Sequence, residues 1–150
     1  ACSFLGIVFS RKWNAPGWMD EINSTIGQGY AVEIIYDTDE LATRVAFAHD
    51  YGSTSTLFIG ILSHARLRLD KIKIAKLCSK YPPAALCIDE SQYAIKTAKA
   101  ATSKAAHFIA DATPGVTRIV CSGNMAPESP CEYWSQFRFC YGKGNYFGNS

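Results

Sequence analysis

The run Leu57-Phe58-Ile59-Gly60-Ile61-Leu62 is the most continuous core-forming stretch in the chain, and the β-favouring Thr54 and Thr56 precede it. A short, unbroken apolar segment of this kind predicts a central β-strand. Shorter segments of similar composition predict further strands at residues 3–9, 30–36 and 116–122. The core of the fold is therefore expected to be a β-sheet.

Helix start and stop signals separate these strands. Asn14 and Pro16 are typical of a helix start, and Asp37 and Glu40 have the three-residue offset of a capping box. Gly52 is placed to end the second of these helices. Helices are predicted over 14–26, 37–51, 71–79 after a capping Asp70, and 91–112.

Residues 131–140 decide how the strands are expected to run. Their side chains alternate as in a strand, with Tyr133, Phe137 and Phe139 on one side and Trp134, Gln136 and Arg138 on the other. Residues 66–69 alternate arginine and leucine in the same way and predict one more strand. No helix is predicted between the strands at 116–122 and 131–140, and this argues against a purely parallel sheet.

We therefore expect an α+β sandwich in a single domain spanning 1–150. Its sheet would be mainly antiparallel, with four to six strands and with helices packed on one face. A flavodoxin-like layered parallel sheet is the alternative.

Composition excludes some functions. The 150 residues carry a net charge of +2 without a dense run of Lys and Arg, so nucleic-acid binding is not indicated. No apolar stretch is long enough to predict a transmembrane segment. No motif of a cofactor-binding protein occurs, and no cofactor is expected.

Six cysteines point to a secreted protein. Their number is even and their spacing fits no zinc motif, which predicts three disulfides that staple the fold; the residues are Cys2, Cys78, Cys87, Cys121, Cys131 and Cys140. The opening Ala1-Cys2-Ser3 resembles the end left by signal-peptide removal. Asn23 begins an Asn-Ser-Thr triplet, a site for an N-linked glycan that would make the chain a glycoprotein.

Histidines supply the candidates for catalysis. His49 lies beside Asp50, and His64 follows the predicted central strand with Arg66 close by. Together with Glu33, these residues suggest a small secreted hydrolase of nuclease-like type as an alternative function. His107 stands four residues before Asp111, which predicts a solvated ion pair on a helix.

Carboxylates at residues 37–40 resemble hard-cation ligands, but helix capping explains them and no metal site is predicted.

The C-terminal region is the preferred binding surface. Its aromatic side chains exceed what one edge strand needs for packing. The candidate binding residues are Trp134, Phe137, Arg138, Tyr141 and Tyr146. We expect a secreted, non-enzymatic interaction protein of the toxin, effector or inhibitor type, binding a protein, glycan or membrane-surface target.

Overall fold

Five parallel strands form the centre of the part of the protein that the structure describes. The computed structural model describes residues 4–26, 31–52, 56–124 and 132–143. The strands are β1 (Phe4–Ser10), β2 (Ala31–Ile35), β3 (Thr56–Ser63), β4 (Ala85–Ile88) and β5 (Thr117–Val120), in the spatial order β2-β3-β1-β4-β5. Every neighbouring pair runs parallel. The fold is an α/β fold, and the expectation of a mainly antiparallel sheet is wrong.

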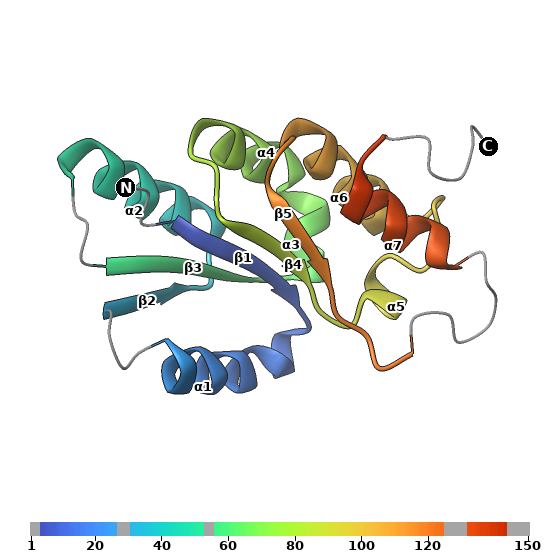
Figure 1. Ribbon diagram of the computed structural model, residues 1–150, viewed down its shortest axis with the longest axis horizontal. Coiled ribbons are helices and arrows are strands. Elements are labelled where there is room, and N and C mark those ends of the chain that lie inside the picture. Colours follow the sequence, from blue (N-terminus) through green and yellow to red (C-terminus); the bar gives the residue numbers. More distant parts are fainter. Residues whose placement is uncertain (1–3, 27–30, 53–55, 125–131, 144–150) are drawn as a thin grey trace.

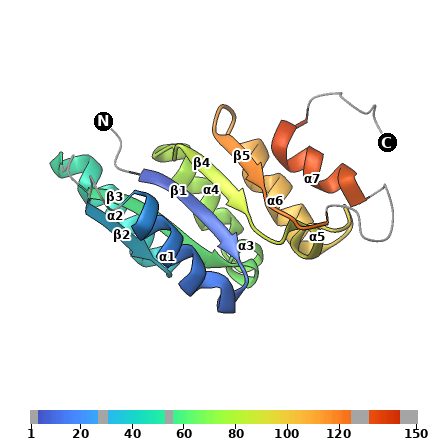
Figure 2. The same cartoon turned by 60° about the horizontal axis from the view of Figure 1, so that its bottom comes forward.

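Helices cover both faces of this sheet, contrary to the predicted one-sided arrangement (Figure 1). On one face lies α1 (Ala15–Thr25), entered through the short 3-10 helix η1 (Lys12–Asn14). The opposite face carries α2 (Thr38–Tyr51), α3 (His64–Leu69), α4 (Lys71–Lys80) and α6 (Ala101–Ala112). The short helix α5 (Ser91–Ala94) follows the end of β4, and α7 (Glu132–Tyr141) lies beside β5 (Figure 2).

Strand order explains why α1, among the described α-helices, lies on the face opposite α2, α3, α4 and α6. The chain moves outward from β1 to β2 and then reverses direction to β3, β4 and β5. Crossovers between parallel strands are right-handed, so a reversal of direction moves the connecting helices to the other face. The connections that leave β1 and β4 therefore diverge, and the carboxyl ends of these two strands form a topological switch point.

The correct sheet direction was signalled by the apolar runs, because strands buried on both faces lack alternation. The alternative prediction, a flavodoxin-like layered parallel sheet, has the correct strand direction. The strand order here differs from that of flavodoxin. Residues 131–140, predicted as a strand, form the helix α7 in their described part. The Arg and Leu alternation at 66–69 lies in the helix α3.

Two other elements differ from the predictions. The strand β4 was missed because it has only 4 residues and begins two positions after the pair Pro82-Pro83. The predicted long helix over 91–112 is divided into α5 and α6. Asp70 makes no capping hydrogen bond at the start of α4, whereas Asp37 and Gly52 cap α2 as predicted.

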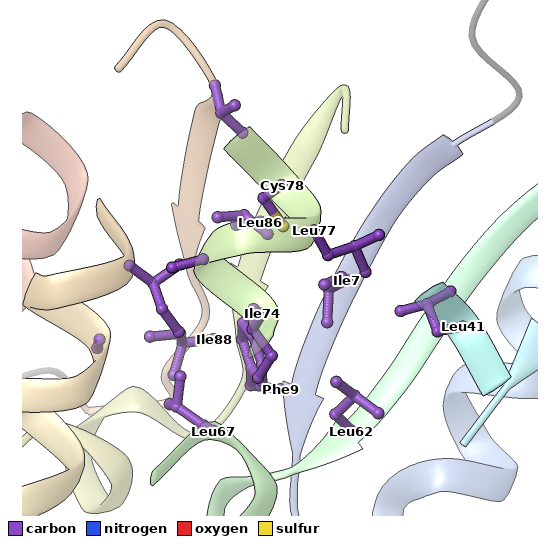
Figure 3. Close-up of a cluster of buried hydrophobic side chains, with 14 of the residues drawn as sticks. Ile7, Phe9, Leu41, Leu62, Leu67, Ile74, Leu77, Cys78, Leu86 and Ile88 are labelled. Carbon is purple, nitrogen blue, oxygen red and sulfur yellow. The ribbon is translucent and has the colours of Figure 1, made fainter. Parts of the chain in front are cut away.

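The larger hydrophobic core lies between the sheet and the helices opposite α1. Figure 3 shows Ile74, Leu77 and Cys78 of α4 packed over Ile7 and Phe9 of β1. A smaller core on the other face joins Ile22 of α1 to β3. In the described residues no helix is long and apolar enough to cross a membrane.

The expected disulfides are absent from the described part of the chain. Cys78, Cys87, Cys121 and Cys140 are free thiols, and Cys2 and Cys131 lie outside the described residues. The Sγ atoms of Cys87 and Cys121 are 3.7 Å apart, far beyond the S–S bond length of about 2.05 Å. Parallel strands bring these two residues together, and apolar burial stabilises the described part of the fold without a disulfide among these four cysteines.

Candidate functional site

Asp89 is the centre of a hydrogen-bond cluster at the switch point. Its Oδ2 accepts hydrogen bonds from Ser10 Oγ at 2.8 Å, Trp18 Nε1 at 3.0 Å and Asn14 Nδ2 at 3.3 Å. Its Oδ1 accepts one from the backbone N–H of Glu90 at 2.9 Å. One carboxylate thus joins the ends of β1 and β4 to the beginning of α1.

Sheet register places these groups together. Phe9 of β1 pairs with Ile88 of β4, and the Asp89 amide donates to the Phe9 carbonyl at 2.9 Å. Ser10 follows Phe9 and Asp89 follows Ile88. The Ser10 hydroxyl and the Asp89 carboxylate therefore meet at the carboxyl edge of the sheet. Glu90 then turns the chain away with a φ of +51°, a strained value for a residue with a side chain.

The Asp89 carboxylate is held in its charged form. Partial burial would raise the pKa of Asp89, but hydrogen bonds from Trp18, Ser10 and Asn14 outweigh it and hold that pKa below its ordinary value. Ser10 is 1% exposed, so its hydroxyl depends on the carboxylate for a partner.

His64, the residue that follows β3, belongs to the same cluster. Its Nε2 lies 3.0 Å from the Asp89 carbonyl oxygen, which only accepts, so Nε2 carries the proton. Burial lowers the pKa of His64, against contacts with the Asp89 and Phe9 carbonyls that raise it. The imidazole is therefore neutral at pH 7 and ties the end of β3 to that of β4.

A pocket opens beside Asp89, between α1 and the end of β4. Its volume is about 420 Å³, in the range of small-molecule sites. The residues that line it are Trp13, Asn14, Gly17, Trp18, Glu21 and Asp89. We call it the carboxyl-end pocket, because it lies at the edge where open α/β sheets bind their ligands.

Aromatic rings also surround Arg11 next to this pocket. The Arg11 guanidinium lies 4.2 Å from the Tyr93 ring centre and 5.4 Å from that of Trp13. Both rings are mostly exposed, Trp13 to 73% and Tyr93 to 61%. The pocket therefore has an aromatic rim that solvent reaches.

Arg66 borders a second pocket, of about 530 Å³, on the other side of α1. Its guanidinium forms ion pairs with Asp37 at 3.1 Å and Asp70 at 3.0 Å. These carboxylates raise the pKa of Arg66, and the hydrogen bond that Arg66 donates to Asp70 contributes most. The charge that was expected to act with His64 is thus neutralised locally.

His49 and Asp50 lie away from this site. They stand at the end of α2, which runs back to the amino edge of the sheet, and their side chains are 3.4 Å apart and exposed. Glu33, on β2, pairs with Arg44 at 3.3 Å. Of the predicted combinations, His49 and Asp50 lie together on the exposed end of α2, whereas Glu33 and His64 are each held by other partners.

The aromatic candidates for binding lie on α7. Phe137 and Tyr141 stack with ring centres 6.0 Å apart, and Trp134 meets the His107 ring at 5.6 Å. Arg138 bonds both carboxylate oxygens of Asp111 at 2.8 Å. Tyr146 lies outside the described residues.

His107 is not the solvated ion-pair partner that the sequence suggested. Its Nε2 lies 2.9 Å from the Ser135 carbonyl oxygen, and burial lowers the pKa of His107. The predicted glycan acceptor, Asn23, is exposed on α1. Within the described ranges, no three His, Cys, Asp or Glu side chains are grouped to hold a metal ion.

Sequence reasoning missed Asp89, Ser10, Asn14 and Trp18 as site residues. The sequence places Asp89 just before the predicted helix over 91–112, and β4 is not predicted from it. A prediction of that strand would have placed both Asp89 and Ser10 at strand ends, where ligand groups gather. The chain matches no protein-family model and no curated protein.

Proposed function

We propose that this chain is a non-enzymatic binding domain that takes a small ligand, or one residue of a larger one, in the carboxyl-end pocket. The observation that carries the proposal is the pocket at the switch point, where two tryptophans and two carboxylates surround about 420 Å³. Ligands of this class include exposed groups of a glycan, protein or membrane surface.

The site is built for binding in one respect above others. Asp89 fixes the Trp18 indole and the Asn14 amide through hydrogen bonds at 3.0 and 3.3 Å. Side chains held in place before the ligand arrives lose little conformational entropy on binding. Preorganised polar groups next to aromatic rings therefore favour recognition.

The hydrolase alternative receives less support. A general base needs a free nitrogen or carboxylate within reach of the substrate. In neutral His64 the basic nitrogen is Nδ1, because Nε2 donates to the Asp89 carbonyl, but His64 is not among the residues that line the carboxyl-end pocket. Asp89 Oδ2 already accepts three hydrogen bonds.

The expectation of secretion came mainly from the predicted disulfides. The binding proposal comes from the pocket and does not require secretion.

Gly17 provides a variant that tests the pocket directly. A Cβ at this position would meet no atom within 4 Å, and Gly17 lines the pocket, so we expect the side chain of Gly17→Leu to occupy part of the pocket. Ala65→Leu, at an exposed residue of α3 that does not line the pocket, is the matched control for added bulk.

The experiment is a thermal-shift screen of three ligand classes: neutral sugars, organic cations and organic anions. A ligand at 100 times its Kd stabilises the wild type by about 2.7 kcal/mol, a shift of about 5–10 °C for a chain of this size. We expect at least one class to shift wild type and Ala65→Leu but not Gly17→Leu. Shifts of equal size in all three proteins, or no shift from any class, would contradict the proposal.

A further inference from the structure

The carboxyl-end pocket carries negative charge without a balancing cation among the described residues that line it. Glu21 and Asp89 contribute two carboxylates, and the other lining residues are uncharged. Arg11 lies next to the pocket, but its guanidinium is over the Tyr93 ring and Arg11 is not one of the lining residues. An anionic ligand would be repelled here.

Two indole rings line the same space. Trp18 packs partly against the small core under the sheet, and its N–H is held by Asp89, so its ring is fixed. Trp13 is exposed and already has the Arg11 cation 5.4 Å from its ring centre. Tryptophan is the aromatic side chain that attracts cations most strongly.

The hydrogen bonds that Asp89 already accepts favour an organic cation over other ligand classes. Its Oδ2 accepts from three donors and its Oδ1 from a backbone amide, so little capacity remains for sugar hydroxyls. A metal ion would have to compete with the N–H groups of Trp18 and Asn14 for the same oxygen. A carboxylate surrounded by donors still acts through its charge, which a cation senses without forming a hydrogen bond.

We infer that the carboxyl-end pocket binds a methylated ammonium group between its two tryptophans, with Glu21 and Asp89 supplying the opposing charge. This inference rests on the proposed function and names its ligand class. A quaternary ammonium suits the site because it has no N–H to donate and a surface of methyl groups that packs on indole rings.

Choline and its uncharged isostere 3,3-dimethylbutanol test the inference, because they differ in charge and hardly in shape. The readout is the pair of indole N–H signals of Trp13 and Trp18 in ¹⁵N-labelled protein. We expect choline to shift both signals and to bind about 3- to 30-fold more tightly than the isostere. Glu21→Gln, at an exposed helix position, should weaken choline about two- to fivefold and leave the isostere unchanged.

Other outcomes overturn the inference in ways that can be told apart. If choline and the isostere bound equally tightly, the pocket would be an apolar one. If methyl glucoside shifted both indole signals and choline did not, the pocket would be a sugar site. In both cases the proposed function stands. If choline moves neither signal, the ammonium inference is wrong, and the ligand screen with Gly17→Leu decides the proposed function separately.

Discussion

Replacement of Asp89 by alanine should loosen the junction of β1, β4 and α1. The change removes four accepted hydrogen bonds, from Ser10, Asn14, Trp18 and the Glu90 amide. Each hydrogen bond to a charged group contributes about 1.5–3 kcal/mol where water is excluded, and less where water can replace it. Of the three side-chain donors, Ser10 is fully buried, while Trp18 and Asn14 are half-buried.

Only the buried Ser10 donor therefore pays its full desolvation penalty, of about 1–3 kcal/mol. Water compensates much of the remainder. We expect Asp89→Ala to lower the free energy of unfolding by about 3 kcal/mol, which lowers Tm by about 6–12 °C for 150 residues. Asp89→Asn keeps one acceptor and should cost about half as much.

Urea unfolding followed by tryptophan fluorescence measures the loss, and the Trp18 indole N–H signal reports the local change. Asp50→Ala is the control, because this carboxylate is 62% exposed and its change should stay within about 0.5 kcal/mol of wild type. If Asp89→Ala were as stable as Asp50→Ala, or if the Trp18 signal did not move, the cluster would not hold this junction together.

Three further predictions concern stability and thiols. Because the pKa of His64 is lowered by burial, the unfolded state gains its proton first as pH falls; stability is complete above about pH 6.5 and declines below it, and His64→Gln should flatten this decline in urea titrations. Gly6→Ala should destabilise, since its Cβ would lie 2.6 Å from the Ala85 carbonyl oxygen, whereas Gly17→Ala should stabilise by about 0.5–1 kcal/mol, and thermal unfolding distinguishes the two. Burial raises the pKa of Cys78 to about 12, so alkylation followed by mass spectrometry should label this thiol slowly in the native protein and at once in unreduced, unfolded protein; a thiol that stays unlabelled after unfolding would mean a disulfide.

Local signals predicted much of the secondary structure. The capping of α2 by Asp37 and Gly52 follows from side-chain and backbone chemistry within a few residues, and it is confirmed. The apolar run 57–62 was predicted correctly as an internal strand, since β3 has a neighbouring strand on each side. Such features need no knowledge of distant parts of the chain.

The prediction of the strand direction failed because residues 131–140 fit both the periodicity of a helix and that of a strand. Residues 133, 137 and 141 are aromatic at four-residue spacing, which suits a helix, while 133, 137 and 139 also fall on one side of a strand. Tertiary packing of α7 beside α6 and β5 decides for the helix. The site failed for a related reason: Asp89 and Ser10 are 79 positions apart, and only the pairing of β1 with β4 joins them.

A chemical-shift map of the protein with the ligand that the thermal-shift screen selects tests the central claim most directly. The account predicts the largest changes at Trp13, Trp18 and Glu21, around the carboxyl-end pocket. A map centred on Tyr133 and Tyr141 of α7 would contradict it and would return the binding surface to the C-terminal aromatic residues.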